Sequence, residues 1–523
     1  GLQHSAEFHA TSRQEVLPYI VLGAGVTYLF AKTIINYRKR KEAGLTGDGD
    51  EEDDSDEDWD EDIDGPRPAA KRKKKAVKLS DISGIAGLDL GSVYSRVGVA
   101  MPEEAEDDED DDDYFSDEDD GTPKAWSVRV VENAEGSRST VSLVGLQPGE
   151  DDFVVGAKAA NLIGSNFWAS HCLLGLTAKD PAAERFMEHF GCGDRILSGI
   201  GGTMQVQVSG TPEDGGRGSP EMLTAQSIAH LRGVATQHIE GEGNECSHML
   251  VAVPEEQWQN EKAAAAYEMA LKQAGAQSLG VERQALCAVH GVDREQQYLR
   301  ADSDADWWEE GRLVAICDVG RSVEVSLIRL GDPETRDAEV LAVESGKPFV
   351  GGQSLDNVII DQLLADFEKE NNGMDLRSDQ MTFERVAEAV NTAKHELSTK
   401  LTADINLPYI SADATGPKHM NATLKRSQFE RDTDFVMRDI LAPCENVFNE
   451  IGEDAVGSTS GLAVAVVGGC ARSEAMVSDV RQMFEKAAAG KLEGPVTLIK
   501  LEMPEEAVVN GAAALAAKRA GWS

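Results

Sequence analysis

Hydrophobic residues near the start of the chain form one long run. Residues 16–31 carry no charge, and the run reaches Tyr37 if Lys32 is allowed near its end. The 22 residues from 16 to 37 would make a helix of about 33 Å, which is long enough to cross a bilayer. Basic residues follow the run at 38–41, whereas a signal peptide carries them before it. Residues 16–37 are therefore predicted to be a transmembrane helix after an N-terminal tail at 1–15, with a signal peptide or a buried helix as alternatives.

The charges beside this helix predict its orientation. Four basic residues follow it at 38–41 and only Arg13 precedes it, so the positive-inside bias places the rest of the chain on the cytosolic or matrix side. The small residues Gly23 and Thr27 would let another transmembrane helix approach closely. A helix that faces only lipid is an equal alternative, because small residues are common in membrane spans.

The segment from 38 to 79 is polar and strongly charged. It holds 13 carboxylates between 48 and 64, followed by a basic stretch at 71–75, and it has too few apolar residues to repay the entropy of folding. A charged linker is expected here, although its acidic and basic parts could also dock on a partner. A second acidic tract holds 14 carboxylates between 103 and 120.

Beyond residue 80, short apolar segments end three times at turns that contain glycine. These segments are 85–90, 313–316 and 462–467, and the first two are each followed by a returning apolar strand. Backbone N–H groups in such turns can face a phosphate, and an acid beside them can face the water shell of a cation. Because helical stretches separate the three segments, the pattern predicts an α/β fold with ligand-binding loops at strand ends.

Composition narrows the function classes further. The chain has 523 residues, of which 41% are hydrophobic, so a wholly disordered protein is excluded. Its formal net charge of −43 would repel a phosphate backbone, so no nucleic acid is expected as a partner. The seven cysteines show no CxxC spacing and the ten histidines no HExxH motif, so neither a disulfide framework nor a dedicated structural metal is predicted.

Five segments in order resemble the nucleotide-binding domain of the seventy-kilodalton heat-shock chaperones. They are GLDLGSVYSRVGVA (87–100), VVENAEGSRSTVSLV (130–144), VAVPEEQWQNEKAAA (251–265), VGGQSLDNVIIDQLL (350–364) and VVGGCARSEAM (466–476). A further stretch, INLPYISADATGPKHMN (405–421), is similar to the bacterial and mitochondrial (DnaK-type) branch. The resemblance implies an actin-like ATPase fold at 80–523, with two lobes around a nucleotide cleft and an acidic hairpin insertion at 102–123. It also implies that MPEEAVVNGAAALA (503–516) is the last segment of this domain. The family's peptide-binding domain is therefore expected to be absent, because the sequence stops at Ser523, directly after this segment.

The same resemblance implies a set of ligand-binding residues. The ligand would be ATP or ADP with magnesium. The carboxylates of the magnesium shell would be Asp89, Glu282, Asp318 and Glu324. The nucleotide-binding residues would be Gly91, Ser92, Val93, Tyr94, Gly320, Arg321, Ser322, Gly351, Gly352, Lys394, Ser398, Gly468, Gly469 and Arg472.

Two departures from the family pattern affect catalysis. The segment FWASHCLLGL (167–176) places His171 where the resemblance implies an essential lysine, and a neutral imidazole cannot replace an ammonium group beside the γ-phosphate. Arg321 stands where the family has glycine, which allows positive φ and close approach of a phosphate. Losing one such charge typically costs a factor of about 10²–10³ in rate, so no catalytic residue is assigned. The alternative is that Arg321 reaches into the cleft and supplies the missing charge.

Three hypotheses follow. The first is a catalytically degenerate nucleotide-binding domain that serves as a membrane-anchored accessory or scaffold subunit. Its partners would be other membrane-protein subunits, bound through the transmembrane helix and the folded domain, and the expected location is the mitochondrial inner membrane with the folded domain on the matrix side. The second is an active, membrane-tethered ATPase that regulates a chaperone or import machine, and the third is a nucleotide sensor that does not hydrolyse ATP.

Overall fold

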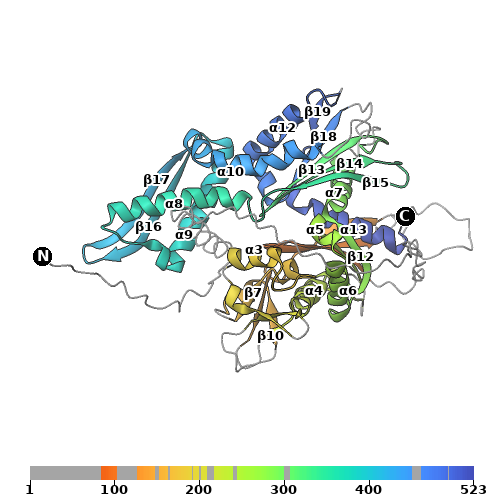
Figure 1. The fold of residues 1–523 in the computed structure, drawn as a ribbon, viewed down its shortest axis with the longest axis horizontal. Helices are drawn as coiled ribbons and strands as arrows, with labels where there is room; N and C mark the ends of the chain where they lie inside the picture. The colour runs from red at the N-terminus through yellow and green to blue at the C-terminus, as the bar shows by residue number, and fades with distance from the viewer. Residues whose placement is uncertain are drawn as a thin grey trace, which may run out of the picture.

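The computed structural model describes residues 84–102, 126–147, 152–162, 165–190, 192–199, 202–208, 217–239, 244–299, 307–449, 461–492 and 494–522. The predicted N-terminal tail, transmembrane helix and charged linker lie outside these ranges, as does nearly all of the acidic insertion. None of the helices within them has the length and hydrophobicity that crossing a membrane requires. The described residues form two lobes (Figure 1).

The first lobe is built on a mixed sheet with the N-terminal strands at its centre. The strands run in the order β12-β11-β1-β2-β3, and β4 pairs with β2. β2 is antiparallel to β1, whereas β11 is parallel to it. The strands are β1 (Ile85–Leu90), β2 (Tyr94–Pro102), β3 (Trp126–Val130), β4 (Thr140–Val141), β11 (His248–Val253) and β12 (Gln277–Arg283). The predicted arrangement of strand, turn and strand around Gly91 is thus confirmed.

The second lobe repeats this arrangement. Its sheet has the order β15-β14-β13-β18-β19, with β14 antiparallel and β18 parallel to β13. The strands are β13 (Leu313–Val319), β14 (Val323–Leu330), β15 (Ala338–Ser345), β18 (Leu462–Val467) and β19 (Val496–Leu498). The strands predicted in the segments 313–325 and 462–467 are present, and the protein has the mixed α/β fold that the sequence predicts.

Two helices, α7 (Gln284–Leu299) and α13 (Ala507–Ala520), lie between the two sheets and join the lobes (Figure 1). Their apolar cluster includes side chains from both sheets, such as Leu250 and Ile316. The outer face of each sheet is covered by other helices. These are α4 (Pro220–Thr236) and α6 (Glu261–Gln273) on the first sheet, and α10 (Arg426–Asn446) and α12 (Glu474–Ala488) on the second.

Each lobe carries an outer unit with its own apolar cluster. The unit of the first lobe contains β5 (Leu143–Leu146), β6 (Phe153–Val155), α2 (Ala157–Ala160), β7 (Asn166–Trp168), the 3₁₀ helix η2 (Ser170–Leu173), α3 (Pro181–Phe190), β8 (Ile196–Ser198), β9 (Met204–Gln207) and β10 (Arg217–Gly218). The unit of the second lobe contains α8 (Gly352–Glu370), α9 (Gln380–Thr399), β16 (Thr402–Asp413) and β17 (Gly416–Lys425), which lie at the left of Figure 1.

The acidic insertion leaves and re-enters the first sheet at neighbouring strand ends. Pro102 at the end of β2 lies opposite Trp126 at the start of β3 in an antiparallel pair. The acidic hairpin insertion at 102–123 stays a prediction, because residues 103–125 lie outside the described ranges. Because its two ends are adjacent, a long insertion at this point leaves the pairing of the sheet intact.

Candidate functional site

A cavity of about 940 Å³ lies between the two lobes. The three turns that follow β1, β13 and β18 all open into it. Most of the nucleotide-binding residues expected from the sequence line this cleft. They are Gly91, Ser92, Val93, Tyr94, Gly320, Arg321, Ser322, Gly352, Lys394, Ser398, Gly468 and Gly469.

Three of the four expected metal-shell carboxylates line the cleft. Asp89 lies near the end of β1, and Asp318 and Glu324 flank the turn between β13 and β14. Burial, and then the negative charge of Asp89, raise the pKa of Asp318 to about 7. Burial also raises the pKa of Glu324 to about 7, with Asp318 contributing in the same direction. These buried carboxylates therefore form an acidic site that a bound cation would stabilise.

The same carboxylates are candidate ligands for a metal ion. Within the part of the chain that the structure describes, no three histidine, cysteine, aspartate or glutamate side chains come close enough to hold a metal together. Magnesium usually keeps several of its waters and needs only one or two direct carboxylate ligands. The three carboxylates that line the cleft supply the oxygen ligands that magnesium prefers.

Glu282 lies elsewhere, in contrast to the expectation. One of its carboxylate oxygens accepts a hydrogen bond from Arg519 of α13, and the other accepts one from the backbone N–H of Arg283. Gln284 occupies the cleft instead, where its side-chain amide donates to Asp89 over 3.4 Å. Glu282 therefore links the first sheet to α13 in this structure.

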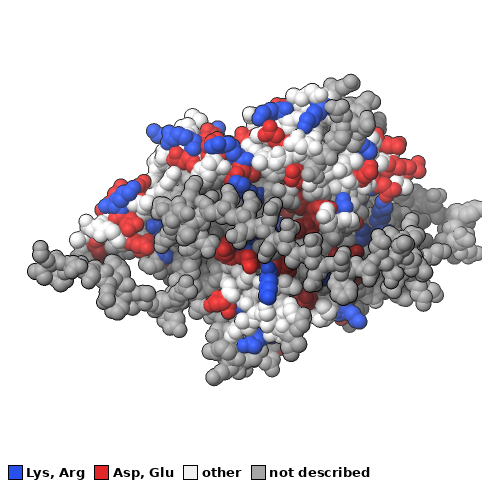
Figure 2. Space-filling view, in the orientation of Figure 1, with Lys and Arg blue, Asp and Glu red and all other residues white. Residues whose placement is uncertain are grey.

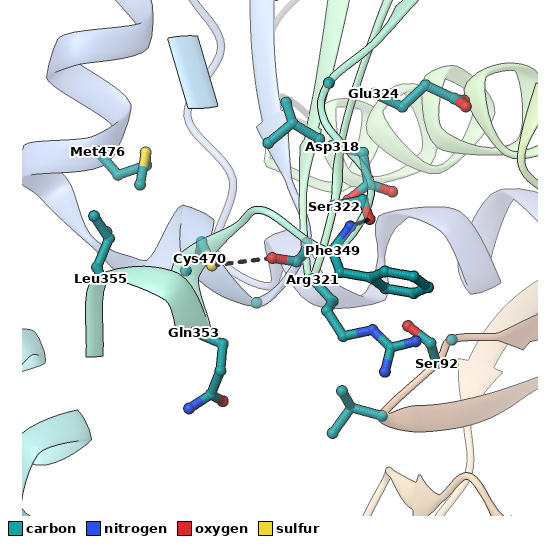
Figure 3. Close-up of a pocket in the computed structure, with 18 of the residues that line it drawn as sticks. Ser92, Asp318, Arg321, Ser322, Glu324, Phe349, Gln353, Leu355, Cys470 and Met476 are labelled. Carbon is teal, nitrogen blue, oxygen red and sulfur yellow. Dashed lines mark hydrogen bonds between the residues drawn. The ribbon is translucent and has the colours of Figure 1, made fainter. Parts of the chain in front are cut away.

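The glycines of the turns allow backbone segments to approach closely. A Cβ atom on Gly351 would overlap the carbonyl oxygen of Gly320, so Gly351 packs against the β13–β14 turn. Gly468 has a φ of +86°, and a Cβ atom there would lie 2.6 Å from a carboxylate oxygen of Asp318. The thiol of Cys470 lies 3.7 Å from the carbonyl oxygen of Gly320 (Figure 3). The turns of the second lobe therefore pack directly on one another beneath the cleft.

The residues expected at the adenosine end are held by a carboxylate that sequence reasoning missed. The ammonium group of Lys394 donates to Asp356 over 2.7 Å and to the carbonyl oxygen of Gly352 over 3.3 Å. Asn391 also donates to Asp356, which is 1% exposed. The sequence feature that could have identified Asp356 as a residue of the site is its position one helical turn after Gly352. Such a buried carboxylate fixes the position of Lys394.

Two other residues of this end have partners nearby. The hydroxyl group of Ser398 lies 3.0 Å from that of Ser473 at the start of α12. Arg472 forms an ion pair with Glu505 and is half exposed. The structure thus places Arg472 beside the cleft-lining Glu505.

His171 lies in η2 on the first-lobe side of the cleft and is 6% exposed. Burial, and then the positive charge of Arg321, lower the pKa of His171 to about 3. Its imidazole is therefore neutral near pH 7. A neutral ring at this position provides no fixed positive charge for a phosphate.

Arg321 crosses toward the first lobe from the β13–β14 turn. Its guanidinium carbon lies 4.3 Å from the ring centre of Phe190 and 4.8 Å from that of Phe349. Neither Gly320 nor Arg321 has a positive φ. The turn thus accommodates an arginine without a positive φ at either residue. Phe349 instead adopts a φ of +60°, and its N–H donates to the hydroxyl group of Ser322 over 2.9 Å.

One comparison with known proteins identifies a family. The model of the Hsp70 protein family matches residues 121–521, which is more than half of the 523 residues. The match covers the second sheet and most of the first lobe. It begins after β1 and β2, so the assignment of Asp89 and of the turn at 91–94 rests on the sequence resemblance and on their position in the cleft.

Proposed function

Because this chain belongs to the Hsp70 family, we propose that it binds a magnesium complex of ATP or ADP between its lobes and hydrolyses ATP slowly or not at all. The family binds ATP or ADP with magnesium, and the mixed α/β architecture is consistent with its actin-like ATPase fold. This chain differs from the family pattern in the charges around the proposed site of the phosphates.

In this proposal the lobes share the work of binding. Asp89, Asp318 and Glu324 would hold the water shell of magnesium, and the turns after β1 and β13 would face the phosphates with their backbone N–H groups. Lys394 and Ser398 would contact the adenosine. Bound magnesium supplies positive charge that offsets the charge developing on the phosphates.

The observation that carries the proposal of slow hydrolysis is the position of His171, which lies buried beside the cleft where the resemblance implies a lysine. Phosphoryl transfer depends on positioning and on charges already in place before the reaction. A buried imidazole that stays uncharged at pH 7 cannot provide such a charge. The loss of one charged group of this kind typically lowers the rate by a factor of about 10²–10³.

Binding and turnover measurements on the detergent-purified full chain test this proposal. We expect calorimetry to show magnesium-dependent binding of ADP and ATP, and we expect single-turnover assays to show little hydrolysis. Asp318→Asn should weaken binding in magnesium but change it little in EDTA. Turnover at the rate of active family members would contradict the proposal, and so would the absence of binding to either nucleotide.

We further propose that the protein is an accessory subunit of a membrane complex, in the mitochondrial inner membrane with its folded domain on the matrix side. The apolar run at 16–37, the basic residues after it and the likeness to the mitochondrial branch support this role. Purification in mild detergent should recover partner subunits with the wild-type chain and also with Asp318→Asn. Removal of residues 1–45 should release the protein from the membrane. Partners that leave when Asp318 is neutralised would favour a working ATPase switch instead.

A further inference from the structure

We propose that Arg321 is the cation that binds the terminal phosphate of a nucleoside triphosphate, and that it makes the cleft select triphosphates over diphosphates. This inference rests on the proposed nucleotide function. The positive charge would come from the second lobe, opposite His171 on the first lobe. Arg321 would bind the terminal phosphate in the ground state but would not restore a charge at the position of His171, so slow hydrolysis is still expected.

Arg321 is buried but its hydrogen-bonding groups are unsatisfied. The residue is 8% exposed, and none of its three guanidinium nitrogens has a hydrogen-bond partner among the described residues. The rings of Phe190 and Phe349 lie near the guanidinium and can stabilise its charge. They offer no oxygen to the N–H groups, which lie in the plane of the guanidinium. A buried charge in this state would be stabilised by an anion that accepts hydrogen bonds from these N–H groups.

The other cations near the carboxylates and the adenosine end are already paired. Arg96 lies 3.9 Å from Asp89, and Lys394 lies 2.7 Å from Asp356. Arg321, in contrast, has no acidic partner within ion-pair distance in the described ranges. It is therefore the buried cation of this cleft that is available to a ligand.

The place of Arg321 in the cleft indicates which part of a ligand would reach it. The residue follows Asp318 by three positions, and Figure 3 shows its side chain extending from the turn toward the side of the cleft where Ser92 lies. Its charge also acts on His171 and Cys172 of the first lobe. Lys394 comes from α9 and donates to the carbonyl oxygen of Gly352, on the second-lobe side of the cleft. A nucleotide that contacts Lys394 with its adenosine, as proposed, could extend its phosphates past the β13–β14 turn toward Arg321.

The chemistry of the cleft favours a phosphate over a simple carboxylate at this point. Asp89, Asp318 and Glu324 would repel a free anion, whereas a triphosphate carries magnesium that offsets their charge. A guanidinium group binds phosphate oxygens through two parallel N–H donors. A nucleoside diphosphate lacks the terminal phosphate that would accept these two hydrogen bonds.

The test compares two ligands and three variants of the full-length protein in detergent. Calorimetry with magnesium would measure the affinity for ADP and for a non-hydrolysable ATP analogue. In Arg321→Gln we expect affinity for the analogue to fall about 10- to 100-fold, which is typical of lost hydrogen bonds to a charged group. We expect affinity for ADP to change by less than about twofold, which also shows that the variant is folded.

Two further variants serve as controls. Arg321→Lys should retain part of the affinity for the analogue, because it keeps the charge but loses the paired donors. Arg438→Gln removes a cleft arginine that is already paired with Asp434, at 2.7 Å, and should leave the preference unchanged.

The outcomes separate this inference from the proposed function. If the wild-type protein binds ADP and the analogue but Arg321→Gln binds the analogue equally well, the role of Arg321 is refuted and the nucleotide function stands. Tighter binding of the analogue to Arg321→Gln would also refute it, and would show that Arg321 blocks the cleft. If Arg321→Gln loses affinity for ADP as well as for the analogue, the proposal that Arg321 recognises the terminal phosphate is refuted. If the wild-type protein binds neither nucleotide, the proposed function fails first.

Discussion

A histidine held neutral inside the cleft links the site to the stability of the protein. Burial lowers the pKa of His171 to about 3, from an ordinary value of 6.5. Between these two pH values the unfolded chain binds a proton at this residue that the folded chain does not bind. The free energy of unfolding therefore falls as the pH is lowered from 6.5 toward 3.

We predict that His171→Gln reduces this pH dependence. Without His171, the unfolded chain no longer binds this extra proton. The slope of the free energy of unfolding against pH should then fall by up to about 1.4 kcal/mol per pH unit. Urea unfolding of the two proteins between pH 7 and pH 4.5 measures the slope. His290→Gln should have a similar effect, because burial also lowers the pKa of His290 to about 3 outside the cleft. Equal slopes in wild-type protein and His171→Gln would contradict a buried neutral imidazole.

A second prediction exchanges the charges of positions 171 and 321. His171→Lys alone places a second cation beside the buried Arg321, so we expect reduced stability and no gain in hydrolysis. His171→Lys combined with Arg321→Gly returns the positive charge to the first lobe and opens the turn. The double variant should hydrolyse ATP at least about tenfold faster than wild-type protein. This is a fraction of the rate factor of about 10²–10³ that one such charged group typically provides. A double variant that binds ATP but is no faster would show that other changes limit catalysis.

At the scale of single residues, the sequence shows which residue type stands at a site, but it seldom shows which other residue that side chain contacts. The loss of the family lysine at His171 and the arginine at position 321 are both visible in the sequence. The pairing of Glu282 with Arg519 is not, because 237 positions separate the two residues and α13 must be placed before they can meet. The ion pair of Lys394 with Asp356 likewise depends on how α9 packs on α8.

At the scale of elements, the contact between α7 and α13 joins the two lobes. A Cβ atom on Gly511 would overlap the carbonyl oxygen of Cys287, and one on Gly291 would overlap that of Ala507. Both glycines are buried within helices, where glycine is otherwise unfavourable by about 0.5–1 kcal/mol. They are present because the two backbones touch.

We predict that Gly511→Ala destabilises the protein by about 1–3 kcal/mol or more, the usual cost of overpacking a core. Gly233→Ala on α4 is the matched control, since a Cβ atom there meets no other atom within 4 Å. This control should stabilise the protein by about 0.5–1 kcal/mol. Thermal and urea unfolding compare the three proteins. If Gly511→Ala is as stable as the control, the helices do not touch as described.

Elements with strong local patterns are the ones the sequence predicts well. The apolar strands β1, β13 and β18 and their glycine turns are recognisable from a few residues each. The short strands β8 to β10 are not, because each has only two to four residues and is stabilised by the packing of its neighbours. The register of β16 on β17 shifts between Leu407 and Ser411, which an alternating pattern does not reveal.

At the scale of the whole molecule, charge is spread over both lobes. Figure 2 shows lysines and arginines interspersed with acids on the face that it displays, rather than one continuous basic surface. That nucleic acid is not a partner stays a prediction from the net charge of −43. The transmembrane helix remains a prediction from residues 16–37, since that segment lies outside the described ranges.

The lobes also meet at Phe349, away from the shared helices. The ring of Phe349 stacks on that of His189, with centres 4.1 Å apart and planes at 15°. His189 lies on α3 of the first lobe, whereas Phe349 precedes α8 of the second. Arg321 lies between Phe349 and Phe190, so three aromatic rings and one cation connect the lobes beside the cleft. In the proposed nucleotide function, these contacts would hold the lobes together beside the bound ligand.

We therefore predict that Phe349→Ala speeds the release of bound ADP. Loss of one aromatic pair should raise the dissociation rate by about 3- to 10-fold, because such pairs contribute about 0.5–1.5 kcal/mol. Stopped-flow release of a fluorescent ADP measures this rate. Tyr409→Ala is a matched control, since Tyr409 is also an aromatic residue with positive φ in the second lobe but is 71% exposed. An unchanged rate in Phe349→Ala, with normal release in the control, would show that the lobes open without separating Phe349 from α3.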